Sequence, residues 1–297
     1  MRTTLPTSTL LLSLLAALVS CSESSESIAK TQILKFTAIP NQSTTLLAQR
    51  FAPLAQHLSK VLGVKIEYVP AVDYPASVEL FKHGDVHLSW FGGLTGVRAR
   101  LAVPGARVIA QGKVDPHFKS YFIANRDSGL EPGESFPMAL AGRKFTFGSD
   151  SSTSGRLMPE YFIRKLTGKS PEEFFGVPMS FSGSHDKTAA LVESGAFDAG
   201  ALDYKVYERL VAEGKLDKDK CRILWVTPEF PDYHWLAHPR LETMFGAGFI
   251  DRLQQALVAI TDPELLAAMD RPEGLILAGD HDFAVCEETA RASGLVR

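Results

Sequence analysis

Cysteine is scarce in this chain. Its 297 residues include only three cysteines, Cys21, Cys221 and Cys286. A disulfide framework, which small secreted proteins use in place of a large core, needs more cysteines than this. For Cys221 and Cys286 two alternatives stay open: a bond between them in an oxidising compartment, or separate burial as thiols.

An excess of charge of one sign is also lacking. The chain carries 31 lysine and arginine residues against 34 aspartate and glutamate residues, a net charge of −3 at pH 7. Such a chain has no basic field to hold nucleic acid, and no run of like charge forms a tail. We therefore expect no nucleic-acid partner.

A hydrophobic run long enough to span a membrane is missing from the N-terminus. The apolar segment Leu10–Val19 follows Arg2 and is too short for a stable span, which is the shape of a signal peptide. It ends in "LVSC", which resembles the lipobox of bacterial lipoproteins and implies a lipid on Cys21. An ordinary secretory signal with a chance cysteine is the alternative.

We expect residues 1–20 to be a lipoprotein signal peptide and residues 21–31, which contain "SESSES", to be a flexible tether. The protein would then lie in the cell envelope, on the periplasmic side, anchored to the membrane through Cys21. The remaining chain is long enough for one large domain or two modest ones.

Signatures of common enzymes are absent. The sequence has no G-x-S-x-G, and Ser184–Lys187 ("SHDK") matches S-x-x-K without its companion S-D-N and K-T-G elements. Gly84 and a strand-like segment separate His83 from His87, which denies them a common helical face for a metal. "IPNQST" is not a G-x-G-x-x-G nucleotide loop. We expect no enzyme, no metal site and no cofactor.

The chain does contain a regular alternation of strand and helix patterns. Ile33–Ile39 is a short apolar strand, and an apolar stripe at helical spacing follows until Gly63 ends it. The residues of this stripe are Leu47, Phe51, Leu54, Leu58, Val61 and Leu62. A strand ("VKIEYV"), a helix through Phe81 and a strand ("DVHLSWF") come next. This is the β-α-β-α-β order of a parallel sheet.

The pattern occurs twice. "KFTAIPNQSTT" from Lys35 and "KFTFGSDSSTS" from Lys144 align at an offset of 109 residues. "VDYPASVELFKHG" and "GSHDKTAALVESG" align at an offset of 111 residues, which pairs Leu80 with Leu191. Similar offsets for separate segments favour two similar α/β lobes, although common constraints on two β-α-β units are an alternative.

We expect a first lobe of residues 32–122 and 226–297 and a second lobe of residues 123–225, joined by a two-segment hinge. The segment "RILWVTPEFPDYHWLAH" after Cys221 supplies extended chain that can cross back. Ligands of open α/β sheets bind outside the carboxyl ends of the strands. The sequence therefore predicts a ligand cleft between the two lobes.

The loop Ser151–Gly155 lies between a strand-like "FTF" and a helix. The free N–H groups at a helix N-terminus suit an anion. Ser152, Thr153 and Ser154 add hydroxyl donors, and Gly155 allows the backbone to approach closely. A helix cap is the alternative for one of these hydroxyls. Four consecutive hydroxyl residues followed by glycine favour an anion site.

Other candidate residues occupy neighbouring loops. Tyr74 and His185 each open a helix at equivalent places in the two lobes, and both can donate a hydrogen bond. A capping or surface role is the alternative for His185. Asp203 follows the last strand of the second lobe and can either accept from a ligand or cap the next helix. Trp90 and Phe91 are core or cleft wall, with core as the default.

These segments resemble the periplasmic phosphonate- and phosphite-binding proteins of ABC importers, over nearly the whole mature chain. The resemblance lies in "VDYPASV", "LSWFGGLTG", "SSTSGRLMP", "SGSHDKTAALVESGAFDAGALD" and "ILWVTPEFPDYHW". It implies a type II periplasmic-binding-protein fold that closes on a small tetrahedral oxyanion. It also implies a monomer that delivers this ligand to an ABC permease and its ATPase.

Matched residue by residue, the resemblance implies a set of residues that hold the oxyanion. They are Tyr74, Ser152, Thr153, Ser154 and His185. Phe91, Asp203 and Asp232 belong to the same set, although the loops of the two aspartates align more loosely.

The resemblance has one clear departure. Phosphonate binders carry W-Y-G where this chain has Trp90-Phe91-Gly92, so one ring hydroxyl is missing at Phe91. The following "GGLTGVRAR" is more similar to a branch of the family proposed to carry selenate. The identity of the oxyanion therefore stays open among phosphite, phosphonate, phosphate, selenate and sulfate.

Protonation distinguishes these ligands. Selenate and sulfate carry no proton at neutral pH, so their sites should offer donors only, whereas partly protonated phosphate-like anions tolerate a carboxylate acceptor. If Asp203 and Asp232 both face the cleft, a bare dianion is disfavoured. A two-lobed sensor for a membrane signalling partner is the alternative function, and a cell-envelope hydrolase is a further one.

Overall fold

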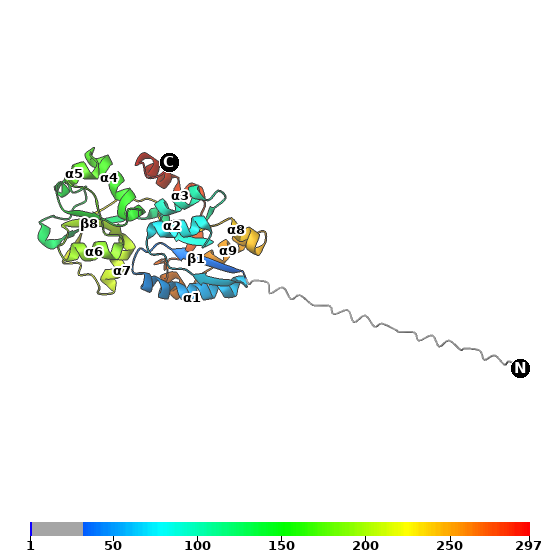
Figure 1. Ribbon diagram of the computed structural model, residues 1–297. Coiled ribbons are helices and arrows are strands. Elements are labelled where there is room, and N and C mark those ends of the chain that lie inside the picture. Colours follow the sequence, from blue (N-terminus) through cyan, green and yellow to red (C-terminus); the bar gives the residue numbers. More distant parts are fainter. Residues whose placement is uncertain (2–31) are drawn as a thin grey trace. The chain divides into compact units, whose positions relative to one another are not determined.

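The computed structural model describes Met1 and residues 32–297 (Figure 1). The predicted signal peptide, the lipid attachment site at Cys21 and the tether lie outside these described residues. In the described part of the chain, no helix combines the length and the apolar character that crossing a bilayer requires.

The first sheet has six strands in the order β11-β4-β10-β3-β1-β2. Its strands are β1 (Ile33–Ala38), β2 (Lys65–Tyr68), β3 (Leu88–Phe91), β4 (Arg107–Gly112), β10 (His234–Ala237) and β11 (Leu275–Leu277). β1 pairs in parallel with β2 and β3, whereas β10 lies antiparallel between β3 and β4. The sheet is therefore mixed, with the predicted parallel unit at one end.

The second sheet has five strands in the order β7-β6-β8-β5-β9. Its strands are β5 (Ser120–Asn125), β6 (Phe145–Phe147), β7 (Ser180–Phe181), β8 (Ala199–Asp203) and β9 (Cys221–Val226). The parallel unit β7-β6-β8 corresponds to β2-β1-β3 of the first sheet, and an antiparallel strand follows each unit. The predicted α/β class is confirmed, and the repeated pattern marks two equivalent units.

Helices cover the sheets on both faces. The helices of the first sheet are α1 (Thr44–Leu62), α2 (Tyr74–His83), α3 (Gly93–Ala102), α8 (Arg240–Phe245), α9 (Phe249–Val258), α10 (Pro263–Ala267) and α11 (Ala284–Ala292). Those of the second are α4 (Met158–Thr167), α5 (Pro171–Phe175), α6 (His185–Glu193) and α7 (Tyr204–Ala212). In Figure 1, α6 and α7 lie on one side of β8, and α4 and α5 lie on the other.

Strand alternation explains this arrangement around the second sheet. Ile123 packs in one buried cluster with Val192 of α6 and Val206 of α7. The neighbouring Phe122 has its ring against Trp225 and Phe145 in a separate cluster. Consecutive residues of a strand point to opposite faces, so both faces of this sheet are apolar and both need a covering layer of helices.

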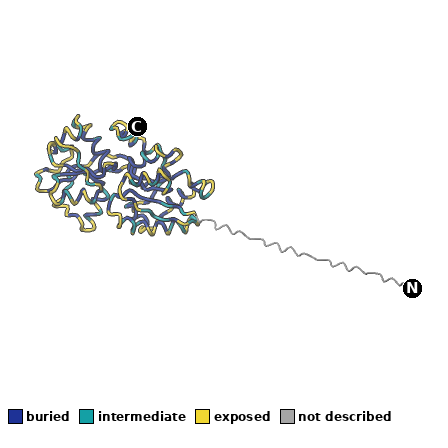
Figure 2. Tube along the Cα trace, in the orientation of Figure 1, coloured by how far each residue is buried: buried dark blue, intermediate teal, exposed yellow. Residues whose placement is uncertain are grey.

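The stripe predicted for α1 is largely buried. Leu47, Phe51, Leu54 and Leu58 are buried against the sheet, and Gly63 ends the helix with a φ of 70°. Val61 differs from the prediction because its exposed fraction is 54%. It lies in the last turn of the helix, whereas the next residue, Leu62, still packs against the core. Figure 2 shows buried residues concentrated in the strands of both sheets.

Two segments connect the sheets, residues 113–119 and residues 227–233. They pair with each other through Phe118 and Phe230, whose backbone N–H groups donate to each other's carbonyls at 2.9 and 3.0 Å. The boundary expected between residues 122 and 123 falls inside β5, all of which pairs within the second sheet. We call the six-stranded sheet with its helices the first lobe and the five-stranded sheet with its helices the second lobe.

A buried ion pair lies beside the two connecting segments. The Nε of Arg271 donates to both oxygens of Asp115 at 2.8 and 2.9 Å, and the two side chains are 2% and 0% exposed. The guanidinium also lies over the ring of Tyr233, 4.8 Å from its centroid, and over Phe118 at 5.3 Å. This pair therefore joins the C-terminal part of the first lobe to both connecting segments.

We predict that Asp115→Asn lowers the free energy of unfolding by about 3–5 kcal/mol, because it leaves the Arg271 charge buried without its counter-ion. The double variant Asp115→Asn/Arg271→Met removes both charges and should recover most of this loss. Urea denaturation measures both values. Glu79→Gln, which breaks an exposed pair with Lys82, is the control and should change stability by less than about 0.5 kcal/mol. A double variant no more stable than the single one would contradict the prediction.

Candidate functional site

Tyr74 and His185 meet where the two lobes face each other. They are the first residues of α2 and α6, as the equivalent positions in the two lobes predict. The hydroxyl of Tyr74 lies 3.4 Å from Nε2 of His185, and the backbone N–H of His185 donates to the carbonyl of Asn41 at 3.1 Å. Both side chains are buried. The lobes are therefore in contact at this point.

The hydrogen bonds of His185 define its tautomer. Its Nδ1 accepts from the backbone N–H of Asp203 at 3.2 Å, so the proton of the neutral ring sits on Nε2, on the side of Tyr74. Burial lowers the pKa of His185. The negative charges of Asp203 and Asp186 raise it, but they offset the effect of burial only in part. His185 is thus a neutral donor whose Nε2–H lies on the side of Tyr74 of the first lobe.

Asp203 is both a helix cap and part of a chain of hydrogen bonds. Its Oδ1 accepts from the N–H groups of Lys205 and Val206, so the capping alternative is realised. Its Oδ2 accepts from the hydroxyl of Tyr233 at 2.9 Å, and Tyr233 in turn accepts from Nδ2 of Asn41 at 3.1 Å. Because these bonds occupy both carboxylate oxygens, Asp203 positions His185 and Tyr233.

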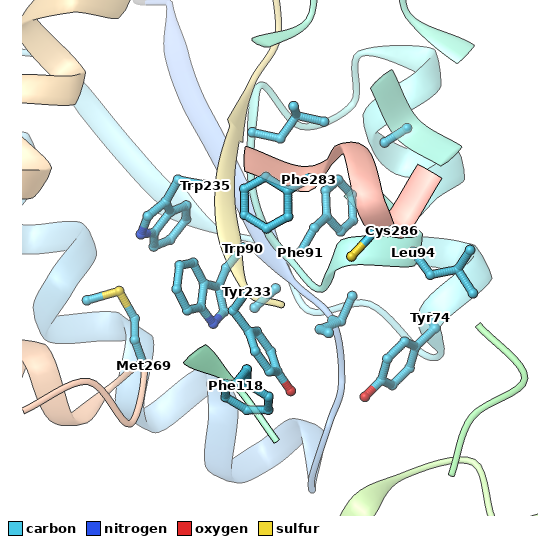
Figure 3. Close-up of a cluster of buried hydrophobic side chains, with 14 of the residues drawn as sticks. Tyr74, Trp90, Phe91, Leu94, Phe118, Tyr233, Trp235, Met269, Phe283 and Cys286 are labelled. Atoms are coloured by element: carbon cyan, nitrogen blue, oxygen red, sulfur yellow. The ribbon is translucent and has the colours of Figure 1, made fainter. Parts of the chain in front are cut away.

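The aromatic side chains around this chain of bonds form one wall of the site. Trp90 stacks on Tyr233 with ring centroids 5.6 Å apart. Figure 3 shows the hydroxyl groups of Tyr74 and Tyr233 pointing toward one another from different elements. Burial raises the pKa of both phenols well above the ordinary range, so both remain protonated at neutral pH.

The stretch Ser152–Gly155 combines a helix cap with a row of donors. Oγ of Ser152 accepts from the N–H of Gly155 at 2.9 Å, and a single π-helical turn, Thr153–Leu157, leads into α4. A Cβ at Gly155 would lie 2.9 Å from that Oγ and 3.0 Å from Cε1 of His185. Only glycine allows this turn to approach the histidine so closely.

Thr153 reaches across to the first lobe. Its Oγ1 accepts from the N–H of Leu94 at 2.9 Å, in the first turn of α3. The preceding N–H, that of Gly93, donates to Oδ1 of Asp232 at 2.9 Å. The N-terminus of α3 therefore holds one residue from the second lobe and one from the second connecting segment. This location suits a carboxylate because of the helix dipole.

Asp232 is the most unusual group of the site. It is 1% exposed, and within residues 32–297 no donor makes a hydrogen bond to its Oδ2. Burial, with a smaller contribution from the charge of Asp203, raises the pKa of Asp232 to about 7. The N–H of Gly93 and the hydroxyls of Thr153 and Ser154 lower this pKa and offset the increase only in part. A buried carboxyl oxygen without a hydrogen-bond donor destabilises the fold. A ligand that donates to this atom would remove that cost.

The structure places Phe91 away from these polar groups. Its ring packs against Phe81 of α2, 5.8 Å between centroids, and it is fully buried. Trp90, the preceding residue of β3, points to the opposite face of the sheet, toward Tyr233. Phe91 therefore packs in the core, which was the default interpretation of the sequence, and its predicted place among the ligand contacts stays a prediction.

The site is lined by neutral donors and by carboxyl groups. Tyr74, His185, Thr153 and Ser154 supply the hydroxyl and imidazole donors. Among residues 32–297, no lysine or arginine side chain makes a hydrogen bond to these four or to Asp232. The same part of the chain contains no group of three side chains that suits a metal ion. Cys221 and Cys286 are buried as separate thiols.

Comparison with known proteins gives the family. The family described as "ABC transporter, phosphonate, periplasmic substrate-binding protein" matches residues 36–283. The chain belongs to this family. Its members bind a substrate for a transporter in the periplasm, so the prediction of a binding protein, and not an enzyme, is confirmed.

Relatives of the phosphonate-binding family resemble the chain over most of their length. A probable phosphite-binding protein, PhnD1 of Prochlorococcus marinus (strain MIT 9301), is 44% identical over 79% of this chain and 80% of its own. The structure of that PhnD1 with methylphosphonate matches with a TM-score of 0.83, covering 90% of this chain and 100% of its own. A phosphate-import protein, PhnD of Mycolicibacterium smegmatis, is 30% identical over 75% of this chain and 70% of its own. The predicted type II fold of the family is thus confirmed.

Sequence reasoning missed two residues of this site, Asn41 and Tyr233. Asn41 belongs to a loop that was expected at the cleft, but nothing singled out its side chain. Tyr233 follows Asp232 directly, and its role depends on a bond to Asp203, thirty residues earlier in the chain. The available signal was the alternation of side-chain direction along the extended segment after Cys221. Neighbouring side chains of such a segment point to opposite sides, so Asp232 and Tyr233 have different neighbours.

We predict that His185 is a neutral Nε2–H tautomer and that it titrates below the ordinary histidine range, because burial disfavours the charged ring. Long-range ¹H–¹⁵N spectra recorded between pH 7 and about 5 report the tautomer and the titration, and the loss of one signal in His185→Gln assigns the ring. A charged His185 ring at pH 7, or an Nδ1–H tautomer, would contradict the geometry.

Proposed function

We propose that this protein binds a small, protonated tetrahedral oxyanion, phosphite or a simple phosphonate, and delivers it to an ABC permease and its ATPase. The observation that carries the proposal is the free Oδ2 of Asp232 beside the hydroxyls of Thr153 and Ser154. The ligands named for the two PhnD relatives and the methylphosphonate complex support the same class.

The donors of the site fit the oxygens of such a ligand. Tyr74 and His185 supply an O–H and an N–H from opposite lobes, 3.4 Å apart. The hydroxyls of Thr153 and Ser154, at the start of the turn that leads into α4, supply donors from a third side. Neutral donors aimed from both lobes bind a compact anion only when the lobes close, since each lobe alone offers half of the contacts.

Asp232 selects among oxyanions by their protons. One hydrogen bond can form between its Oδ2 and a ligand oxygen only if one proton lies between the two groups. Above the raised pKa of Asp232, about 7, the ligand must bring this proton. Phosphite and phosphonates can do so, whereas sulfate and selenate cannot. Both oxygens of Asp203 already accept hydrogen bonds within the protein, whereas Oδ2 of Asp232 accepts none among the described residues. For this reason, we assign this selection to Asp232. We therefore propose phosphite or phosphonate in preference to selenate.

We further propose that the protein acts as a monomer anchored by a lipid on Cys21. The lipobox-like "LVSC" supports the anchor, and "SESSES" supports a tether that lets the binding lobes reach the permease. Mass spectrometry of membrane-extracted protein tests the anchor. A Cys21→Ser variant released from membranes is expected, and an unlipidated wild type would overturn this part of the proposal.

Calorimetry against a panel of anions tests the binding function. We expect heat of binding with phosphite and methylphosphonate, and a stabilisation of about 2.7 kcal/mol in thermal shift at a hundred times Kd. Thr153→Val should abolish binding while the fold survives, because it removes a donor and leaves the N–H of Leu94 unpaired. Thr167→Val, at the C-terminal end of α4, is the matched control. The absence of binding to phosphite, phosphonates, phosphate, sulfate and selenate would overturn the proposal.

Asp232→Asn should change selectivity. The wild type should prefer phosphite to selenate by at least about tenfold at pH 8, because a carboxylate repels a dianion and cannot donate to it. The affinity of the wild type for phosphite should fall as pH rises through the raised pKa of Asp232, about 7. Above this pH the proton between Asp232 and the ligand is lost. The amide donates at every pH, so Asp232→Asn should gain selenate affinity and lose this pH dependence. The exposed Asp251→Asn is the control, and selenate binding that equals phosphite binding in the wild type would contradict the assignment.

A further inference from the structure

A short segment of the first lobe, Asp270–Glu273, contacts the second lobe at a distance from the ligand site. It follows α10, and Asp270 has a φ of 56°, the only positive φ at a residue other than glycine among the described residues. Such a conformation is disfavoured for most side chains, although aspartate and asparagine tolerate it. The conformation turns the Asp270 carboxylate toward two arginines.

Asp270 accepts hydrogen bonds from both lobes. Arg50 of α1, in the first lobe, donates to Oδ1 at 2.5 Å and to Oδ2 at 3.4 Å. Arg209 of α7, in the second lobe, donates from Nε to Oδ2 at 3.3 Å and from its terminal nitrogen to Gln42 of the first lobe at 2.5 Å. Arg50 thus holds the carboxylate in place within one lobe, and Arg209 is the contact from the other.

Lys205 and Glu273 make a second ion pair between the same two elements. The Nζ of Lys205, in the first turn of α7, lies 3.0 Å from Oε1 of Glu273. We call the four residues Lys205, Arg209, Asp270 and Glu273 the clasp. Arg209 and Asp270 are 12% and 14% exposed, so solvent screens their interaction only partly.

The clasp is connected to the ligand site by rigid elements. Asp203 is the N-cap of α7, and the helix carries Arg209 about 9 Å further along its axis. On the other side, Gln42 directly follows Asn41, whose carbonyl accepts from the N–H of His185. Arg271, within the segment Asp270–Glu273, donates to Asp115 and lies over the ring of Tyr233. Movement of α7 relative to the first lobe therefore changes the clasp and the site together.

We propose that the clasp holds the second lobe against the first and thereby sets the lifetime of the closed, ligand-bound protein. The inference rests on the proposed function, because closure around an oxyanion is the event that the clasp prolongs. Arg209 retains Glu213 of its own helix as a partner, 3.4 Å away, when the lobes separate. The clasp can therefore break and form again without leaving an arginine unpaired. Its residues are positioning residues, since none of their side chains makes a hydrogen bond to a residue of the ligand site.

Kinetics of phosphite release from the purified protein tests the proposal. Arg209→Met and Asp270→Asn should each raise the dissociation rate by about tenfold, while the association rate stays within about twofold. Asparagine keeps the positive φ of residue 270 accessible, so a fold defect is not expected. The double variant should release ligand no faster than Arg209→Met alone, because Arg209→Met already removes the contact of Asp270 with the second lobe.

A matched control separates the clasp from general effects of charge removal. Arg291→Gln breaks an ion pair with Glu287 inside α11, far from α7, and should leave both rates unchanged. Small-angle scattering without ligand adds a readout that binding does not influence. The radius of gyration of Arg209→Met should exceed that of the wild type and of Arg291→Gln, because the lobes separate more often.

The outcomes distinguish this inference from the proposed function. If the wild type binds none of the oxyanions, the proposed function fails, and scattering alone decides whether the clasp holds the lobes. Unchanged dissociation rates in Arg209→Met and Asp270→Asn would overturn the clasp although binding stands. Additive effects in the double variant, or an unchanged radius of gyration for Arg209→Met without ligand, would overturn it as well.

Discussion

The buried carboxyl group of Asp232 is the constraint on which the site depends. A carboxyl group without solvent needs donors, and the first N–H of α3 supplies one. The next N–H of that helix, that of Leu94, donates to Oγ1 of Thr153 in the opposite lobe. One helix terminus thus joins a connecting segment, the first lobe and the second lobe. The oxygen of Asp232 without a donor lies near the hydroxyls of Thr153, Ser154 and Tyr74.

The same residues hold the fold and form the candidate site. Ser152 and Asp203 are helix caps, and their capping bonds place the hydroxyl row and His185. The capping and binding interpretations of such residues are therefore compatible, because a capped terminus is a rigid one. Rigid donors lose little freedom when they bind an anion, which favours affinity.

The sequence predicted much of this arrangement before any coordinates. Helical spacing located α1, and the repeated pattern indicated two equivalent β-α-β units with Tyr74 and His185 at matching helix starts. It did not predict that β10 inserts between β3 and β4, nor that all of β5 belongs to the second sheet. Local propensity marks a strand but not its partners, which long-range pairing selects.

The sequence by itself determined the element order, the hydroxyl-rich turn and the charge class of the ligand, because these follow from local pattern and residue chemistry. Only the tertiary structure decided that both oxygens of Asp203 accept hydrogen bonds from the protein, whereas Oδ2 of Asp232 accepts none from the described residues. It also decided that Phe91 faces the core, and that Asn41 and Tyr233 join the site. The physical reason is that burial and hydrogen-bond direction arise between residues far apart in the chain, and no local pattern encodes them.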